Sequence, residues 1–180
     1  MEKPWSHGFV LSAIFMLVLL FHWRASSAAP TSKLVEEVCK EVSEQVHRPG
    51  CVEALTSDPR TSSADPKALA KITVEMAISK TTESQNFIKN LASTSPKFKA
   101  PLETCVSSYG SALSALKGTL KELLEDDIES ASYSIKMPDD EAEVCESALT
   151  TNKAPFPEVT TRNNYVKLFS SIGIVVINRL

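Results

Sequence analysis

The sequence predicts an all-α protein, an up-and-down four-helix bundle that follows an N-terminal helical hairpin and contains two disulfides. Three observations lead to this prediction. Apolar residues recur at helical spacing along most of the chain, patterns typical of strands are scarce, and four cysteines lie beyond the first 28 residues. The length of 180 residues suits one folded domain.

The first 28 residues have the pattern of a signal peptide. Residues 9–21 read FVLSAIFMLVLLF, an uncharged run of 13 residues, whereas a helix that crosses a bilayer needs roughly 20. The small residues Ala25-Ser26-Ser27-Ala28 follow, and signal peptidase accepts side chains of this kind. We therefore expect cleavage after Ala28, export, and no membrane association of the mature chain. A signal anchor is the alternative.

Residues 29–62 are expected to form the helical hairpin. Val35, Val38, Val42 and Val46 recur at spacings of three and four, which indicates one face of a first helix. Valine is a poor helix former, so this helix depends on tertiary contacts or on a disulfide. Pro49-Gly50 is expected to end the helix.

A loop rich in turn residues, SDPRTSSADPKAL at residues 57–69, leads into the bundle. Its two Asp-Pro pairs raise the question of a charged chemical site, but the rules for helix starts explain them better. Ser63 or Asp65 can cap the amides of the next helix, and Pro66 suits the first turn of that helix. Arg60 can pair with a carboxylate and attach the loop to the bundle.

Residues 63–180 are expected to form the four-helix bundle. Four helices are predicted. The first covers residues 66–91, and the second follows an apolar seam over residues 102–123. The third runs from after residue 126 to residue 149 with an interruption at Pro138, and the fourth lies towards the C-terminus. The seam alternates spacings of four and three: Leu102, Val106, Tyr109, Leu113, Leu116, Leu120 and Leu123. The last helix is predicted from Tyr165, Phe169, Ile172, Val176 and Leu180. The β-branched run at residues 174–177 is predicted to be helical, because no partner strand exists for it.

The four cysteines are the candidate site residues: Cys39, Cys51, Cys105 and Cys145. An even number of cysteines in an exported chain indicates disulfides, and four cysteines allow three pairings. The spacing favours Cys39–Cys51 and Cys105–Cys145, because each bond would close a local segment between neighbouring helices. Zinc would need close C-x-x-C pairs or nearby histidines, so neither a metal nor another cofactor is expected.

Residues typical of catalysis are scarce. His47 is the only histidine after the signal peptide, and no nucleophile motif lies beside it. The acidic cluster Glu122, Glu125, Asp126 and Asp127 is typical of a solvated helix end rather than of paired catalytic carboxylates. Residues 29–180 hold 17 basic and 21 acidic residues without a basic block, which disfavours nucleic acid as a partner. We therefore expect that the protein is not an enzyme.

The order of the cysteines, with a short first interval and a long third one, resembles the plant invertase and pectin methylesterase inhibitor family. The resemblance covers nearly the whole chain after residue 28. It includes Asp58-Pro59-Arg60 and Ala64-Asp65 before the first bundle helix, Cys105-x-x-x-Tyr109 followed by Ala112 and Leu116, and Cys145 before a closing apolar helix.

The resemblance implies an exported inhibitor that binds a cell-wall or vacuolar carbohydrate-active enzyme one to one and blocks its active site without a cofactor. It implies a monomer when free, one disulfide within the hairpin, and one disulfide between the second and third bundle helices. The cell wall, reached by the secretory route, is the expected destination, and the vacuole is the alternative.

The resemblance leaves two target enzymes open. Some invertase inhibitors of this family carry Pro-Lys-Phe between the third and fourth cysteines, whereas this chain has Pro96-Lys97-Phe98 before Cys105. We interpret that tripeptide as a turn in which Phe98 covers one end of the bundle. The segment after the Cys105 helix reads Asp126-Asp127-Ile128, acidic where the family motif is basic. Pectin methylesterase is therefore the favoured target, acid invertase is the alternative, and a non-inhibitory extracellular bundle protein is a further one.

Overall fold

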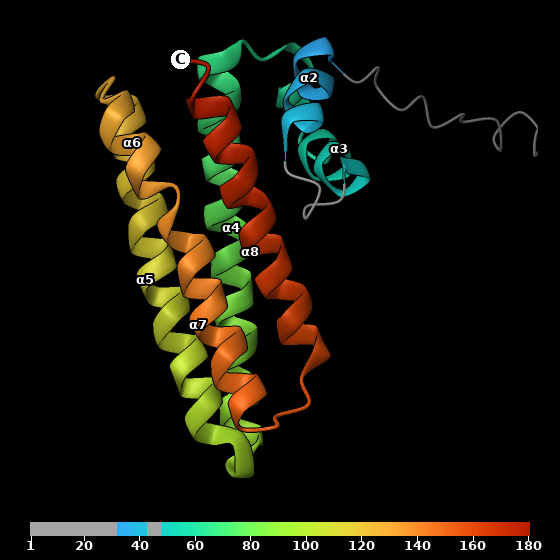
Figure 1. The fold of residues 1–180 in the computed structure, drawn as a ribbon, viewed down its shortest axis with the longest axis vertical. Helices are drawn as coiled ribbons and strands as arrows, with labels where there is room; N and C mark the ends of the chain where they lie inside the picture. The colour runs from blue at the N-terminus through green and yellow to red at the C-terminus, as the bar shows by residue number, and fades with distance from the viewer. Residues whose placement is uncertain (1–31, 43–47) are drawn as a thin grey trace, which may run out of the picture.

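A computed structural model describes residues 32–42 and 48–180 of the chain. Its four long helices run alternately up and down: α4 (Pro66–Thr94), α5 (Lys99–Leu124), α7 (Met137–Thr151) and α8 (Pro157–Ile177) (Figure 1). A short helix, α6 (Ile128–Ser134), lies between α5 and α7 at one end of the bundle. The predicted four-helix bundle is confirmed, and no strand occurs among the described residues.

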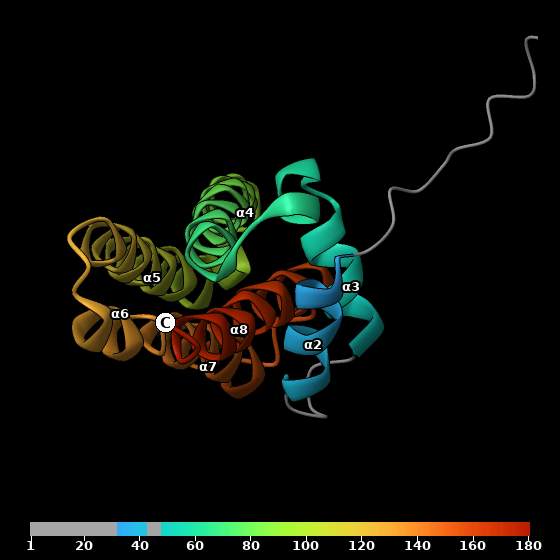
Figure 2. The same cartoon turned by 90° about the horizontal axis from the view of Figure 1, so that it is seen from above.

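Two shorter helices, α2 (Lys33–Glu41) and α3 (Arg48–Thr56), form the hairpin beside α8 and the first turns of α4 (Figure 2). A 3₁₀ turn, η1 (Pro59–Ser63), connects the hairpin to the bundle. Helix α2 ends at Glu41, earlier than the valine pattern predicted, and Val46 and His47 lie outside the described residues. Pro49-Gly50 does not end a helix, because both residues lie in the first turn of α3. Proline is tolerated there, since the first amides of a helix have no intrahelical acceptor.

The core consists of two clusters of buried apolar side chains. One cluster joins the hairpin to the upper part of the bundle in Figure 1 and includes Val35, Leu55, Leu69 and Ile172. The other fills the opposite end around the Cys105–Cys145 disulfide. The predicted α5 seam supplies both clusters, and most of its residues are buried: Leu102, Tyr109, Leu113, Leu116 and Leu123.

The last helix differs from its prediction at both ends. It begins at Pro157, and its inward face includes Val159, Asn163 and Val166 before the predicted Phe169, Ile172 and Val176. Tyr165 is 48% exposed, and Leu180 lies beyond the helix. The apolar spacing counted from Tyr165 was therefore wrong for these two residues. Residues 174–177 are helical, as predicted.

The break between α6 and α7 lies two residues before the proline that predicted it. Ile135 and Lys136 separate the two helices, and Pro138 occupies the first turn of α7. The fully buried Ile135 side chain packs against Gly173 of α8, where an added Cβ would lie 2.6 Å from Ile135 Cγ1. The small residue at 173 thus allows the α6–α7 junction to approach α8 closely.

Candidate functional site

Both disulfides that the spacing favoured are present. Cys39 and Cys51 join α2 to α3 with their Cα atoms 5.6 Å apart, and Cys105 and Cys145 join α5 to α7 with their Cα atoms 4.3 Å apart. All four cysteines are buried in the two clusters of the core. The first bond therefore lies within the hairpin, and the second bond lies within the bundle.

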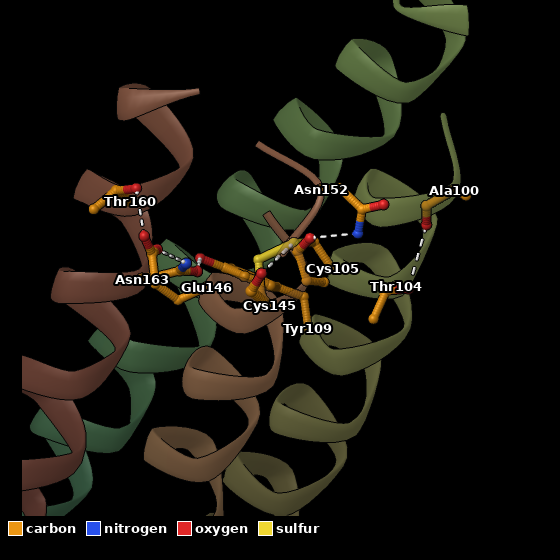
Figure 3. The surroundings of a disulfide bond; sticks show 10 residues. Ala100, Thr104, Cys105, Tyr109, Cys145, Glu146, Asn152, Thr160 and Asn163 are labelled. Atoms are coloured by element: carbon orange, nitrogen blue, oxygen red, sulfur yellow. Dashed lines mark hydrogen bonds between the residues drawn. A yellow bond between two sulfur atoms is a disulfide. The ribbon is translucent and has the colours of Figure 1, made fainter. Parts of the chain in front are cut away.

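A polar network lies beside the second disulfide and connects three helices (Figure 3). The Tyr109 hydroxyl on α5 donates to Asn163 Oδ1 on α8 at 2.9 Å, and Asn163 Nδ2 donates to Glu146 Oε2 on α7 at 2.7 Å. Thr160 Oγ1 donates to the other oxygen of Glu146 at 2.9 Å. Tyr109 and Asn163 are each about 1% exposed, and burial raises the pKa of the Tyr109 hydroxyl above its usual range. A satisfied buried network of this kind fixes the relative positions of the helices.

The Asp-Pro loop has a structural role, as the helix-start rules predicted. Arg60 donates from Nη2 to Asp58 Oδ2 at 2.7 Å and from Nη1 to Glu75 Oε2 of α4 at 2.7 Å, so it attaches the loop to the bundle. The hydrogen bonds from Arg60 hold the pKa of Asp58 below its usual range. Asp65 is the residue that caps α4, because its Oδ1 accepts from the Ala68 amide at 2.7 Å.

The Pro96-Lys97-Phe98 tripeptide forms the 3₁₀ turn η2 (Pro96–Phe98) between α4 and α5. The Phe98 ring packs edge-on against the Phe156 ring, with the ring centroids 5.5 Å apart. Both side chains lie against the core cluster around the Cys105–Cys145 disulfide. This agrees with the interpretation of the tripeptide as a turn whose phenylalanine covers one end of the bundle.

The acidic cluster at the end of α5 contributes to local structure. Asp127 caps α6 by accepting from the Ser130 amide at 3.1 Å, and this hydrogen bonding with Ser130 lowers the pKa of Asp127. Asp126 pairs with Lys67 of α4, and Glu122 accepts from the Ser134 hydroxyl at 3.1 Å. Glu125, Asp126 and Asp127 are exposed as predicted, whereas Glu122 is half-buried.

Two of the grooves on the described surface border α8. One groove of about 480 Å³ lies between α3, α4 and α8, and Arg162 lines it. The Arg162 guanidinium carbon lies 4.2 Å from the centroid of the Phe87 ring, and its Nη1 lies 3.5 Å from Glu83 Oε1. The arginine is therefore held against side chains of α4. The other groove, of about 450 Å³, lies between α6 and the C-terminal end of α8, and Tyr133 and Leu180 line it. The sequence pattern indicates neither groove, because each is formed by segments far apart in the chain.

The described residues include neither a cluster of metal-ligating side chains nor a helix suited to span a membrane. No three His, Cys, Asp or Glu side chains among them are placed to hold a metal ion. None of the described helices combines the length and the apolarity needed to cross a bilayer. The geometry that does stand out is a rigid scaffold, consisting of four long helices, two disulfides and a buried polar network.

Comparison with protein families matches residues 33–175 to "Plant invertase/pectin methylesterase inhibitor". The cell wall / vacuolar inhibitor of fructosidase 2 of Arabidopsis thaliana is 29% identical over 178 residues, which cover 94% of this chain and 97% of that relative. The pectinesterase inhibitor of Actinidia deliciosa is 29% identical over 136 residues, which cover 74% of this chain and 73% of that relative.

The fold is also similar to that of solved structures. The crystal structure of mutant form A of a pectin methylesterase inhibitor from Arabidopsis aligns with a TM-score of 0.73 at 19% identity, covering 83% of this chain and 98% of that one. At this identity the similarity establishes a shared fold, and the family match extends over most of the described residues. The chain therefore belongs to the plant invertase/pectin methylesterase inhibitor family.

Proposed function

We propose that this chain is a secreted protein inhibitor that binds a plant pectin methylesterase one to one and blocks its active site. The observation that carries the proposal is the family match over residues 33–175, on a chain that folds as the helical bundle of pectin methylesterase inhibitors. A relative from Actinidia deliciosa is named a pectinesterase inhibitor. The inhibitor acts without a cofactor and without turnover.

The scaffold suits tight binding to a preformed cleft. The Cys105–Cys145 disulfide and the Tyr109–Asn163–Glu146 network hold α5, α7 and α8 in fixed positions before any partner arrives. A rigid protein loses little conformational entropy on docking, so more of the contact energy contributes to affinity.

The chemistry of the α5–α6 turn favours pectin methylesterase over invertase. Asp126 and Asp127 occupy this turn, where the invertase inhibitors with a Pro-Lys-Phe motif would present a basic residue. The Pro96-Lys97-Phe98 of this chain lies in η2, and Phe98 packs against Phe156 instead of projecting freely. Acid invertase is the second candidate target, because a relative that matches 94% of the chain is named an inhibitor of fructosidase.

The proposed site of action is the cell wall, reached after removal of residues 1–28, with the vacuole as the alternative. The name of the Arabidopsis thaliana relative includes both compartments. The free inhibitor is proposed to be a monomer. Expression of the full chain in a secreting plant host, followed by mass spectrometry of the secreted protein, tests whether it begins at Ala29.

The test of function is an inhibition titration with the secreted, oxidised protein. A purified plant pectin methylesterase and a purified plant acid invertase are each titrated at about pH 5 and about pH 7. We expect stoichiometric loss of pectin methylesterase activity with invertase unaffected. The reverse result would assign the chain to the invertase branch. A folded protein that inhibits neither enzyme would favour a non-inhibitory extracellular bundle protein.

A further inference from the structure

Exposed apolar side chains are concentrated on one part of the molecule. Among the described residues, six large apolar side chains are exposed, and four of them lie within residues 124–144: Leu124, Tyr133, Met137 and Val144. Tyr133 is 73% exposed, the largest fraction of the six. Large apolar groups that cluster on a surface mark sites of interaction more often than scattered ones do.

A groove lies beside Tyr133, the most exposed of these side chains. Tyr133 and Ile128 of α6 line it on one side, and Leu180 beyond α8, itself 43% exposed, lines it on the other. A hydrogen bond from Ser132 Oγ to Asn178 Oδ1 at 3.0 Å joins the two sides of the groove. Met137 directly follows Lys136, which lines the groove, and Val144 lies on the same face of α7 as Met137, since a spacing of seven residues returns to the same face of a helix.

The charge around these apolar groups is strongly negative. Residues 122–146 contain ten acidic residues and a single basic one, Lys136, whereas the whole chain has a formal net charge of only −3. Three of these acids pair with lysines outside the segment, Glu125 with Lys121, Asp126 with Lys67 and Glu143 with Lys167, and Glu146 belongs to the interior polar network. The other six acids face only Lys136 within the segment, so the end of α5 together with α6 and α7 remains net negative. Glu129 lines the groove, and Asp140 is exposed on α7.

We call this surface the α6–α7 face: it consists of Leu124, Tyr133, Met137, Val144 and Leu180 with the surrounding acidic side chains. We infer that the α6–α7 face docks on the target enzyme, at a patch of the enzyme in which apolar residues are surrounded by lysine and arginine. The inference rests on the proposed inhibitor function and identifies the surface through which it acts. Charge complementarity supports this occupant, because an acidic surface attracts a basic partner and rejects an acidic one.

The same charge argues against two other occupants. A second copy of the chain docked through the same face in a symmetric dimer would bring two strongly acidic surfaces together. An anionic polysaccharide would be repelled for the same reason. A basic protein can instead bind the apolar groove with its own apolar side chains and the acidic surroundings with its positive charges, so both features contribute to binding.

The test compares two charge-reversed proteins that differ only in where the charge changes. One is Glu129→Lys/Asp140→Lys on the α6–α7 face. The matched control is Glu36→Lys/Glu158→Lys on α2 and α8. All four residues are exposed acids in the first turn of a helix, so each substitution has a similar effect on its helix dipole, and both proteins gain the same net charge. Circular dichroism and thermal melting check that each protein is folded.

The measured quantity is the dissociation constant with the purified target enzyme at about 0.05 M and 0.5 M NaCl. We expect Glu129→Lys/Asp140→Lys to weaken binding about tenfold or more at low salt and less at high salt, because salt screens charge pairs at the protein surface. The control should change binding less than about threefold. Tyr133→Ala should weaken binding about tenfold at both salt concentrations, because aromatic residues at the centre of an interface dominate its energy.

Each outcome bears on a different step of the inference. A wild-type protein that inhibits its target, together with α6–α7 variants that bind as tightly as the control, would overturn the α6–α7 face and leave the inhibitor function intact. A wild-type protein that inhibits neither enzyme would reject the proposed function and this occupant together. A wild-type dimer in sedimentation equilibrium that Tyr133→Ala dissociates would assign the face to a second copy and overturn the inference.

Discussion

Removal of the Cys105–Cys145 disulfide should lower the stability of the bundle by about 4 kcal/mol. The bond closes a loop of 40 residues between α5 and α7. In the chain-entropy account, a cross-link of this span removes about 13 cal/mol/K of entropy from the unfolded chain, which amounts to about 4 kcal/mol at 25 °C. The shorter Cys39–Cys51 loop, with a separation of 12, should contribute about 3 kcal/mol by the same relation.

The perturbation is Cys105→Ser/Cys145→Ser, with Cys39→Ser/Cys51→Ser as the comparison. Urea unfolding, followed by circular dichroism, gives the free energy of unfolding of each protein, and thermal melting gives an independent measure. For a domain of about 150 residues, a loss of 4 kcal/mol corresponds to a fall of roughly 8–16 °C in Tm. A protein that lacks both bonds should lose about 7 kcal/mol, comparable to the whole stability of about 5–15 kcal/mol of an ordinary domain.

Inhibition should follow the folded fraction of each variant. The protein with four serines is expected to lose inhibition at 25 °C. Each protein with one remaining bond should inhibit at 25 °C but, on heating, should lose inhibition at a lower temperature than the wild type does. Full inhibition by the protein with four serines would contradict the structural role of the two bonds. So would a change of less than about 1 kcal/mol in the free energy of unfolding after loss of the Cys105–Cys145 bond.

Three further predictions concern packing, pH and the buried network. Gly173→Ala should lower the free energy of unfolding by about 1–3 kcal/mol, because the new methyl group would overlap the buried Ile135, and Ile135→Ala in the same protein should relieve part of this loss in a double-mutant urea series. Burial raises the pKa of Asp139, so the ionised Asp139 side chain destabilises the fold once the pH has risen through the raised pKa. Asp139→Asn should therefore raise Tm at pH 7 and have no effect at pH 3. A gain in Tm at both pH values would contradict this. Tyr109→Phe should cost about 1–2 kcal/mol in urea unfolding, because it leaves the buried Asn163 without the hydroxyl donor; an unchanged midpoint would show that the bond contributes nothing.

The apolar pattern predicted the bundle well where packing alone decides which residues face inward. The α5 seam is the clearest case, since a helix packed against two neighbours buries residues at alternating spacings of three and four. The pattern failed at the start of α8, where the buried residue is Asn163. An asparagine breaks an apolar pattern, and its burial depends on Tyr109 and Glu146, which belong to other helices.

Prolines were predicted to end helices and instead lie in their first turns. Pro49 and Pro138 each belong to the first turn of the helix that follows. From the sequence alone, a proline after one helix and a proline at the start of the next give the same signal when the connection is short. The structure resolves this ambiguity at the α6–α7 junction, because Ile135 packs against Gly173 and fixes where the break occurs.

The candidate interaction surface was only partly visible in the sequence. The acidic residues 122–127 stood out as a cluster, but α7 contributes further acids that the fold places beside α6. The groove could not be predicted, because Leu180 reaches Tyr133 only through the packing of the last helix. Contacts between residues distant in sequence depend on how helices are arranged, which periodicity does not specify.

In both disulfides, each cysteine is bonded to the next cysteine along the chain. A chain that emerges from its N-terminus during synthesis therefore presents Cys39 and Cys51 together before either residue of the second pair becomes available. When Cys105 and Cys145 follow, the first two sulfurs are already occupied, and one partner remains for each. Where oxidation of the first pair keeps pace with synthesis, the native bonds form in chain order and the slow reshuffling of wrong pairs is not required.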